Sequence, residues 1–140
     1  MNYSISICYP NKENIEEIRD VHQSEIQNKF QNYPWEEQQK TLESDPENAQ
    51  YSPSFRITNK RDKHWLELTA MRKKDKTISF SKWFNRLTEK KVLFGLLGTK
   101  MKLSVIDDNF EESQSINLEE ASELVKLFLN QHYKEVEERI

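Results

Sequence analysis

The middle of the chain contains three successive stretches in which apolar and polar residues alternate, and this pattern limits the possible folds more than any other feature. The stretches cover about 55–58, 65–71 and 78–83, and short polar segments rich in lysine separate them. Alternation with a period of two is typical of strands that bury one face. The sequence therefore predicts an antiparallel meander, extended by two further strands over about 90–97 and 101–105.

The N-terminal part of the chain predicts one strand and two helices. Residues 3–9 alternate in the manner of a half-buried strand. Asn14 with Glu17 resembles a capping box, and apolar residues at spacings of three and four then predict a helix as far as Phe30. A second, short acidic helix is predicted over about 35–43.

The C-terminal part predicts one long helix. Asn117 and Glu120 form a second capping-box candidate, and the apolar stripe that follows continues toward Val136. Runs of like elements, rather than alternating strands and helices, indicate the α+β class. We expect a single domain over residues 1–140, with an antiparallel meander sheet of about five to six strands and helices packed on one face.

Residues suited to catalysis or to metal and phosphate binding are not grouped in this sequence. Cys8 is the only cysteine, the three histidines fall in three different predicted elements, and only two glycines occur. Phosphate-cradling loops need several close glycines, and structural zinc sites need a group of thiolate or imidazole ligands. We therefore expect no catalytic residue, no metal site and no cofactor, and we expect binding rather than enzymatic chemistry.

The sequence also bears on location. Its N-terminus lacks the basic and apolar regions of a signal peptide, and its longest apolar run has six residues. A membrane-spanning helix needs about 20 mostly apolar residues, and a single cysteine forms no disulfide within the chain. These features predict a cytoplasmic protein without a membrane segment.

Charge is segregated along the chain. Residues 1–50 carry a net charge of −6, residues 51–102 carry +10, and residues 103–140 carry −7. The overall charge of −3 therefore hides a basic middle between two acidic ends. Such a pattern bears on the choice of partners more than on the fold.

The first part of the candidate partner-binding site is an acidic surface on the short helix and the loop after it. Five acids fall within twelve residues there, and only Lys40 opposes them within that segment. They are Glu36, Glu37, Glu43, Asp45 and Glu47. We expect them to favour association with a basic protein partner, because surface charge raises association rates. Solubility is the competing explanation.

The second part of the candidate site lies on one face of the predicted sheet. If the helices cover the face that bears Leu66 and Phe80, the opposite face collects five large apolar side chains. They are Trp65, Met71, Trp83, Leu93 and Leu97. Apolar residues on a nominally exposed face indicate a protein partner, a homodimer contact, or cover by the loop of residues 44–54.

Nucleic acid is a further candidate partner. Lysine-rich turns lie at both ends of the strand predicted over 65–71, and Trp65 and Trp83 are close enough in sequence to provide stacking. The acidic helices and the isoelectric point near 5.7 weigh against this interpretation. Lysine-rich turns also serve solubility and edge protection, so we do not expect nucleic acid to be the partner.

The N-terminal strand over 3–9, the meander over about 54–106 and the capped helix that begins after Asn117 together form a familiar layout. It resembles small cytoplasmic immunity proteins of bacterial toxin–immunity systems. The resemblance implies a non-catalytic protein that needs no cofactor and neutralises a toxin domain by occluding its surface. Such proteins often present acidic patches to basic nuclease toxins, and the net charge of −3 departs from strongly acidic members. The alternative is a homodimeric regulatory or accessory protein that contacts nucleic acid through its lysine-rich turns.

The sequence predicts that folding requires neither a metal nor a nucleotide. Thermal melting with and without a chelator, and with a panel of divalent ions and nucleotides, should therefore give the same midpoint. A ligand at one hundred times its Kd stabilises a folded protein by about 2.7 kcal/mol, which is easily measured. A reproducible upward shift of several degrees with any of these additives would contradict the prediction.

Overall fold

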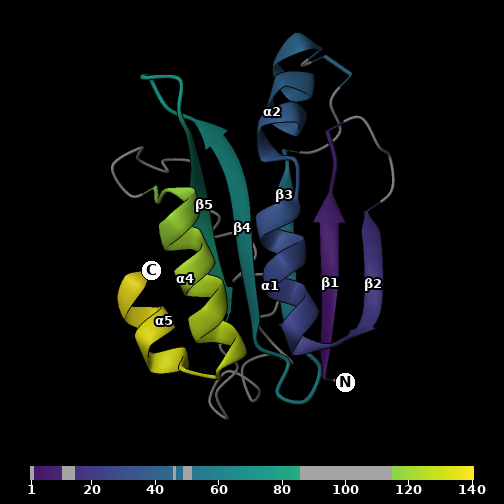
Figure 1. Cartoon of the computed structure of the whole chain (residues 1–140), viewed down its shortest axis with the longest axis vertical. Coiled ribbons are helices and arrows are strands. Elements are labelled where there is room, and N and C mark those ends of the chain that lie inside the picture. The colour runs from purple at the N-terminus through teal and green to yellow at the C-terminus, as the bar shows by residue number, and fades with distance from the viewer. Residues whose placement is uncertain (1, 11–14, 46, 49–51, 86–114) are drawn as a thin grey trace, which may run out of the picture.

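Five antiparallel strands form the centre of the structure (Figure 1). The structure, a computed structural model, describes residues 2–10, 15–45, 47–48, 52–85 and 115–140. The strands are β1 (Tyr3–Cys8), β2 (Glu16–Val21), β3 (Ser54–Asn59), β4 (Trp65–Arg72) and β5 (Ile78–Asn85), in the spatial order β2-β1-β3-β4-β5. The strands predicted over 90–97 and 101–105, with Leu93 and Leu97, lie outside the described residues.

Four helices in the described part of the chain lie on one face of this sheet, which we call the inner face (Figure 1). They are α1 (Gln23–Asn32), α2 (Trp35–Ser44), α4 (Leu118–Leu129) and α5 (Tyr133–Arg139). Together with the antiparallel sheet they confirm the predicted α+β class and the packing of helices on one face.

The core lies between the inner face and the helices, and aromatic rings fill its centre. Phe30 of α1 is fully buried and its ring lies 5.5 Å from that of Phe55 and 5.9 Å from that of Phe80, measured between centroids. The Trp35 ring of α2 lies 4.8 Å from the Phe80 ring, and its Nε1 donates a hydrogen bond to the carbonyl of Phe30. These contacts attach two helices to two strands, β3 and β5, through a single cluster, which fixes their relative positions.

The helix predicted from Asn14 to Phe30 is wrong in its first half. Glu16–Val21 is a strand, β2, which pairs with the free edge of β1, and α1 begins only at Gln23. The free edge of β1 needs hydrogen-bond partners, and this tertiary requirement overrides the helical spacing. β2 is exposed except for Ile18 and Val21, as a charged edge strand usually is.

Of the residues expected on the apolar face of that helix, those in α1 are buried and those before it are not all buried. Ile26 and Phe30 are buried in α1 as predicted, whereas Ile15 is 44% exposed. His22 is also exposed and caps α1, since its Nδ1 accepts a hydrogen bond from the backbone N–H of Ser24 at 3.2 Å. Asn14, the expected cap, lies outside the described residues.

The C-terminal helix begins where the sequence predicts and ends earlier. The Asn117 side chain accepts from the N–H of Glu120 at 2.8 Å, and the Glu120 side chain accepts from the N–H of Asn117 at 3.3 Å, which is a complete capping box. The predicted single helix divides into α4 and α5 because Gln131 adopts a left-handed backbone conformation, with φ of 60°. The break turns α5 back toward the sheet, where Val136 is fully buried.

The capping box predicts a measurable contribution to stability. Asn117→Ala should lower the free energy of unfolding by about 1 kcal/mol, because the first turn of α4 loses an acceptor. Asn117→Ser is the matched control, since serine caps helices nearly as well. Urea denaturation of both variants is the measurement, and equal losses in the two would show that the cap is not the cause.

Candidate functional site

The face of the sheet turned away from the helices, here called the outer face, carries two of the three tryptophans. Within β4 and β5, Glu67 pairs with Trp83 and Trp65 pairs with Asn85. Directly paired residues share a face, and side chains alternate along a strand, so both tryptophans lie opposite to the buried Leu66. This is the placement that the alternating pattern predicts.

Arg56 of β3 lies on the outer face beside these residues. It pairs with Glu67 across the strands, and its Nε lies 3.3 Å from Glu67 Oε1. Its guanidinium carbon lies 4.1 Å from the centroid of the Trp65 ring, which is a cation–π contact. Arg56, Trp65, Glu67 and Trp83 therefore form one group on three neighbouring strands, which we call the outer-face cluster.

Access to the outer face varies along its length. Ser54, Ser79 and Ser81 are buried although strand register places them on this face. The four residues of the outer-face cluster are half-buried, with 35% of the Arg56 side chain exposed. Met71, also half-buried, lies opposite Ser79 at the more enclosed end. The outer-face cluster is therefore a group of large side chains that stays partly accessible on this face.

Two of the five predicted acidic residues make ion pairs within the molecule. Arg72, at the end of β4, lies 3.1 Å from Glu36 and 2.5 Å from Glu43, both on α2. The contact lowers the pKa of the Glu43 carboxyl, chiefly through the hydrogen bond from Arg72. Glu36 and Glu43 thus attach α2 to the sheet, a role that does not require a partner.

The other three acidic residues lie on the surface of α2 and the loop after it. Glu37, Asp45 and Glu47 are exposed, and none of them makes an ion pair among the described residues. Asp45 accepts two hydrogen bonds from Asn48. These acids form a smaller patch than the five positions suggest.

The acidic residues and the tryptophans do not form one continuous surface. α2 packs against the inner face through Trp35, whereas the outer-face cluster lies on the opposite side of the same strands (Figure 1). The predicted partner-binding residues therefore belong to two separate surfaces, and one partner of ordinary size would contact one or the other.

The charge segregation of the sequence becomes a separation between layers. The four helices contain ten acidic and five basic residues, a net charge of −5. Residues 54–85, which form β3 to β5 and their turns, contain nine basic and three acidic residues, a net charge of +6. The inner side of the molecule is thus acidic and the β3–β5 part of the sheet is basic.

A polar cluster joins the turn between β3 and β4 to α5. The Tyr133 hydroxyl donates to Asp62 Oδ2 at 2.8 Å and accepts from Asn59 Nδ2 at 2.9 Å. The buried His64 ring stacks on the Tyr133 ring, with centroids 4.4 Å apart and planes at 5°. Its Nδ1 lies 2.8 Å from Asp62 Oδ1, at ion-pair distance but without hydrogen-bond alignment.

The environment of this cluster shifts two pKa values in opposite directions. Burial raises the pKa of the Tyr133 phenol, and its hydrogen bond to Asp62 raises it further. Burial alone would also raise the pKa of the Asp62 carboxyl, but hydrogen bonds from the backbone N–H of His64 and from the Tyr133 hydroxyl outweigh it and lower that pKa. The cluster therefore contains a carboxylate and a neutral phenol near neutral pH, an arrangement that stabilises the junction.

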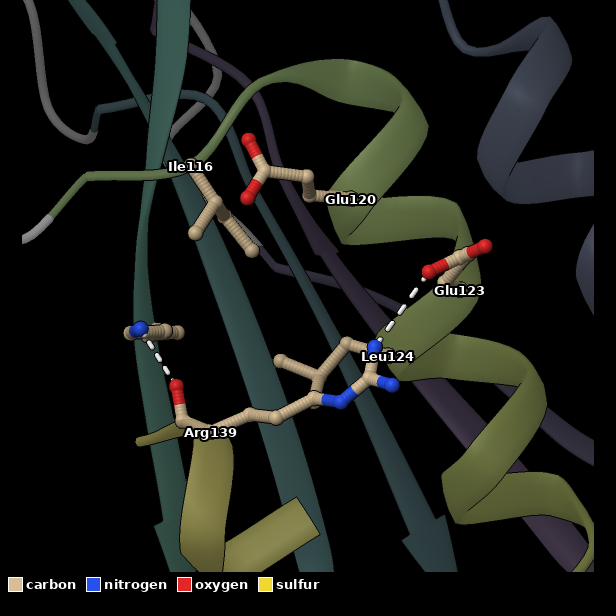
Figure 2. A pocket seen from close by; sticks show the side chains of 6 residues that line it. Ile116, Glu120, Glu123, Leu124 and Arg139 are labelled. Carbon is tan, nitrogen blue, oxygen red and sulfur yellow. Dashed lines mark hydrogen bonds and ion pairs between the residues drawn. The ribbon is translucent and has the colours of Figure 1, made fainter. Parts of the chain in front are cut away.

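A pocket of about 320 Å³ lies between β5 and the helices α4 and α5 (Figure 2). It is lined by Lys82, Ile116, Glu120, Glu123, Leu124 and Arg139. Arg139 lies 3.2 Å from Glu123, and Lys82 donates to the Arg139 carbonyl. These contacts balance the charges of the pocket, so it does not offer a converging acid, base or nucleophile.

The part of the chain that the structure describes contains neither a cluster of metal ligands nor a membrane-spanning helix. No three side chains of His, Cys, Asp or Glu converge there as ligands of a metal ion would. Among the same residues, no helix combines the length and the apolar character needed to cross a bilayer.

The chain has no detectable relative in three comparisons. Models of known families, curated proteins and solved structures all give no match. A function can therefore be inferred only from the residues and contacts of this chain.

The sequence missed the polar members of both clusters. Arg56 and Glu67 were not candidates, because ordinary strand alternation explains charged residues on a solvent face. Arg56 and Glu67 stand out only as a pair of opposite charges on neighbouring strands, and this pairing can be recognised only when the register of β3 and β4 is known. Asp62 and His64 lie two residues apart in one turn, which places them close together in space. Their contact with Tyr133 could not be predicted, because Tyr133 lies about 70 residues later in the chain.

The lowered pKa of Asp62 predicts a pH dependence of stability. Its contribution is fully present above the pKa of the unfolded carboxyl and is lost as pH falls through the lower pKa of the folded state. Asp62→Asn should therefore lower the free energy of unfolding at pH 6, and the difference from the wild type should shrink progressively toward pH 2. Urea denaturation across this pH range measures the difference. A difference that stays constant with pH would contradict the prediction, and Glu47→Gln, at an exposed position without an ion pair among the described residues, is the control.

Proposed function

We propose that the protein is a non-catalytic, cytoplasmic binding protein of the immunity type, which inhibits a toxin domain by covering part of its surface with the outer face of β3, β4 and β5. The observation that carries the proposal is the outer-face cluster, in which Arg56 and two tryptophans lie together and remain accessible. Tryptophan and arginine are the side chains most enriched at the energetic centres of protein interfaces.

Strand geometry supports the choice of this surface. The cluster lies on three adjacent strands of one sheet, so its backbone is held by ladder hydrogen bonds on both sides of β4. A rigid surface loses little conformational freedom when it binds, and more of the contact energy then appears as affinity. Aromatic rings add large contact areas with few rotatable bonds.

Charge weighs against the alternative of a homodimer through the same face. Residues 54–85 carry a net charge of +6, and joining two outer faces would bring two such segments together. Like charges facing each other across an interface disfavour association. A different protein partner avoids this repulsion.

The genomic and cellular tests follow directly from the proposal. We expect the gene for this chain to lie beside a gene for a large secreted toxin, and co-expression of the chain to protect cells from the toxin domain. The purified chain and toxin domain should form a complex on size-exclusion chromatography. A neighbouring toxin that neither binds the chain nor is neutralised by it would overturn the proposal.

Within such a complex, Trp83→Ala should weaken binding by about 2 kcal/mol or more, as aromatic residues at interface centres do. Stability should change less, because Trp83 is only half-buried. Leu118→Ala is the matched control, since Leu118 is a large apolar side chain that is 42% exposed on α4, away from the outer face. Calorimetric titration measures the affinities. If Trp83→Ala unfolds the protein instead, Trp83 belongs to the core and the surface is misassigned.

The acidic surface of α2 remains the second candidate interface, for a basic partner, and its charge allows a clean discrimination. The double variant Glu37→Lys, Glu47→Lys leaves the ion pairs of Arg72 intact. We expect its association rate with the toxin domain to equal that of the wild type at low salt, because the outer face makes the contact. A slower rate with a weaker salt dependence would assign the interface to α2 instead.

A further inference from the structure

We propose that the outer-face cluster binds an acidic group of its protein partner, and that Arg56 receives a carboxylate on the two terminal nitrogens of its guanidinium. The inference rests on the proposed function and adds the chemical class that the surface selects. It concerns the part of the side chain that the intramolecular contacts leave available.

The contacts of Arg56 use one face and one nitrogen of the guanidinium. The Trp65 ring lies against the planar group, at 4.1 Å from its carbon, and Nε interacts with Glu67 at 3.3 Å. The Arg56 side chain makes no other hydrogen bond or ion pair among the described residues. Among the described residues the terminal nitrogens thus have no acceptor, and 35% of the side chain is exposed.

This arrangement orients Arg56 for bidentate binding. An arginine normally loses considerable rotamer freedom when it binds, and stacking on an indole removes part of that freedom in advance. Glu67 fixes the rotation of the plane through Nε. Two parallel N–H donors held in a plane match the geometry of a carboxylate, and such bonds are among the strongest in proteins.

The surroundings of the cluster favour an anionic partner. Residues 54–85 carry a net charge of +6, although Arg72 and Lys60 form ion pairs with other elements. Lys63, in the turn just before Trp65, makes no ion pair among the described residues, whereas Lys73 and Lys76 lie in the turn at the other end of β4. Glu67 is the acidic residue nearest to Arg56, and the same arginine neutralises it. The surface potential here is therefore complementary to an acidic protein surface.

The first experiment uses a peptide probe, N-acetyl-hexaglutamate amide, at low ionic strength. Binding is followed by the indole N–H resonances of Trp65 and Trp83 and the Nε–H resonance of Arg56. We expect saturable shifts of these three signals, whereas N-acetyl-hexalysine amide should leave them unchanged. Absence of shifts with hexaglutamate up to millimolar concentrations would overturn the inference.

Variants of Arg56 separate its role from that of general positive charge. Arg56→Met should weaken hexaglutamate binding by roughly tenfold, and Arg56→Lys by several-fold because lysine keeps the charge but lacks the planar fork. Lys29→Met removes an exposed cation on α1 and should have no effect. Equal effects of Arg56→Met and Lys29→Met would show non-specific attraction and overturn the inference. If Arg56→Met does not fold, Arg56→Lys is compared with the wild type alone, and unchanged hexaglutamate binding in Arg56→Lys would overturn the inference.

Nucleic acid is the competing polyanion, and the same spectra distinguish it. An oligothymidylate of twelve nucleotides should bind no better than hexaglutamate and should not depend on Trp83. Tighter binding that Trp83→Ala abolishes would reassign the face to single-stranded nucleic acid. The toxin-domain complex separates the two proposals. If Trp83→Ala weakens it and Arg56→Met does not, the carboxylate inference fails while the proposed function stands.

Discussion

Burial of the inner sheet face against α1, α2 and α4 is the constraint on which the rest of the structure depends. Phe30, Phe80 and Phe128 are completely buried there, together with the inward residues of β3 and β4. Because side chains alternate along a strand, fixing Leu66 and Leu68 inward places Glu67 outward without any further interaction. A slip of one residue would bury the carboxylate of Glu67 and expose both leucines, at a cost of several kcal/mol. The packing that stabilises the fold therefore also determines which residues the outer face presents.

Polar contacts at the margins of the core orient the helices without supplying much stability. Arg72 connects β4 to α2, and the contact between Asp62 and Tyr133 connects the β3–β4 turn to α5. Exposed ion pairs contribute little net stability, so the Arg72 pairs act mainly on the position of α2. Their larger consequence is electrostatic. They neutralise two of the acids of α2 and join the acidic helical layer to the basic β3–β5 segment.

The outer-face cluster shows how folding can prepare a surface for binding. Arg56 is oriented by Trp65 and Glu67 as soon as β3 and β4 pair, so the ordering of its side chain is a cost of folding rather than of association. The same residues in an unpaired strand would be a flexible cation, a carboxylate and an aromatic ring without defined geometry. In the proposed complex, strand register thus contributes to affinity through Arg56 and to the choice of partner through charge.

Local patterns in the amino-acid sequence establish the α+β class, the three alternating strands β3 to β5, and the capping box of Asn117, because all of these depend on local periodicity or short spacing. The same patterns place Trp65 and Trp83 on one face, since alternation puts both opposite to the apolar, inward-facing Leu66 and Phe80. Only the tertiary structure decided that Glu16–Val21 is a strand, because an unpaired edge of β1 overrides local helical spacing. It likewise decided that Arg72 binds Glu36 and Glu43, and that Arg56 lies on Trp65. These contacts join residues brought together by register and helix packing, and a long-range contact of this kind has no signature in local spacing.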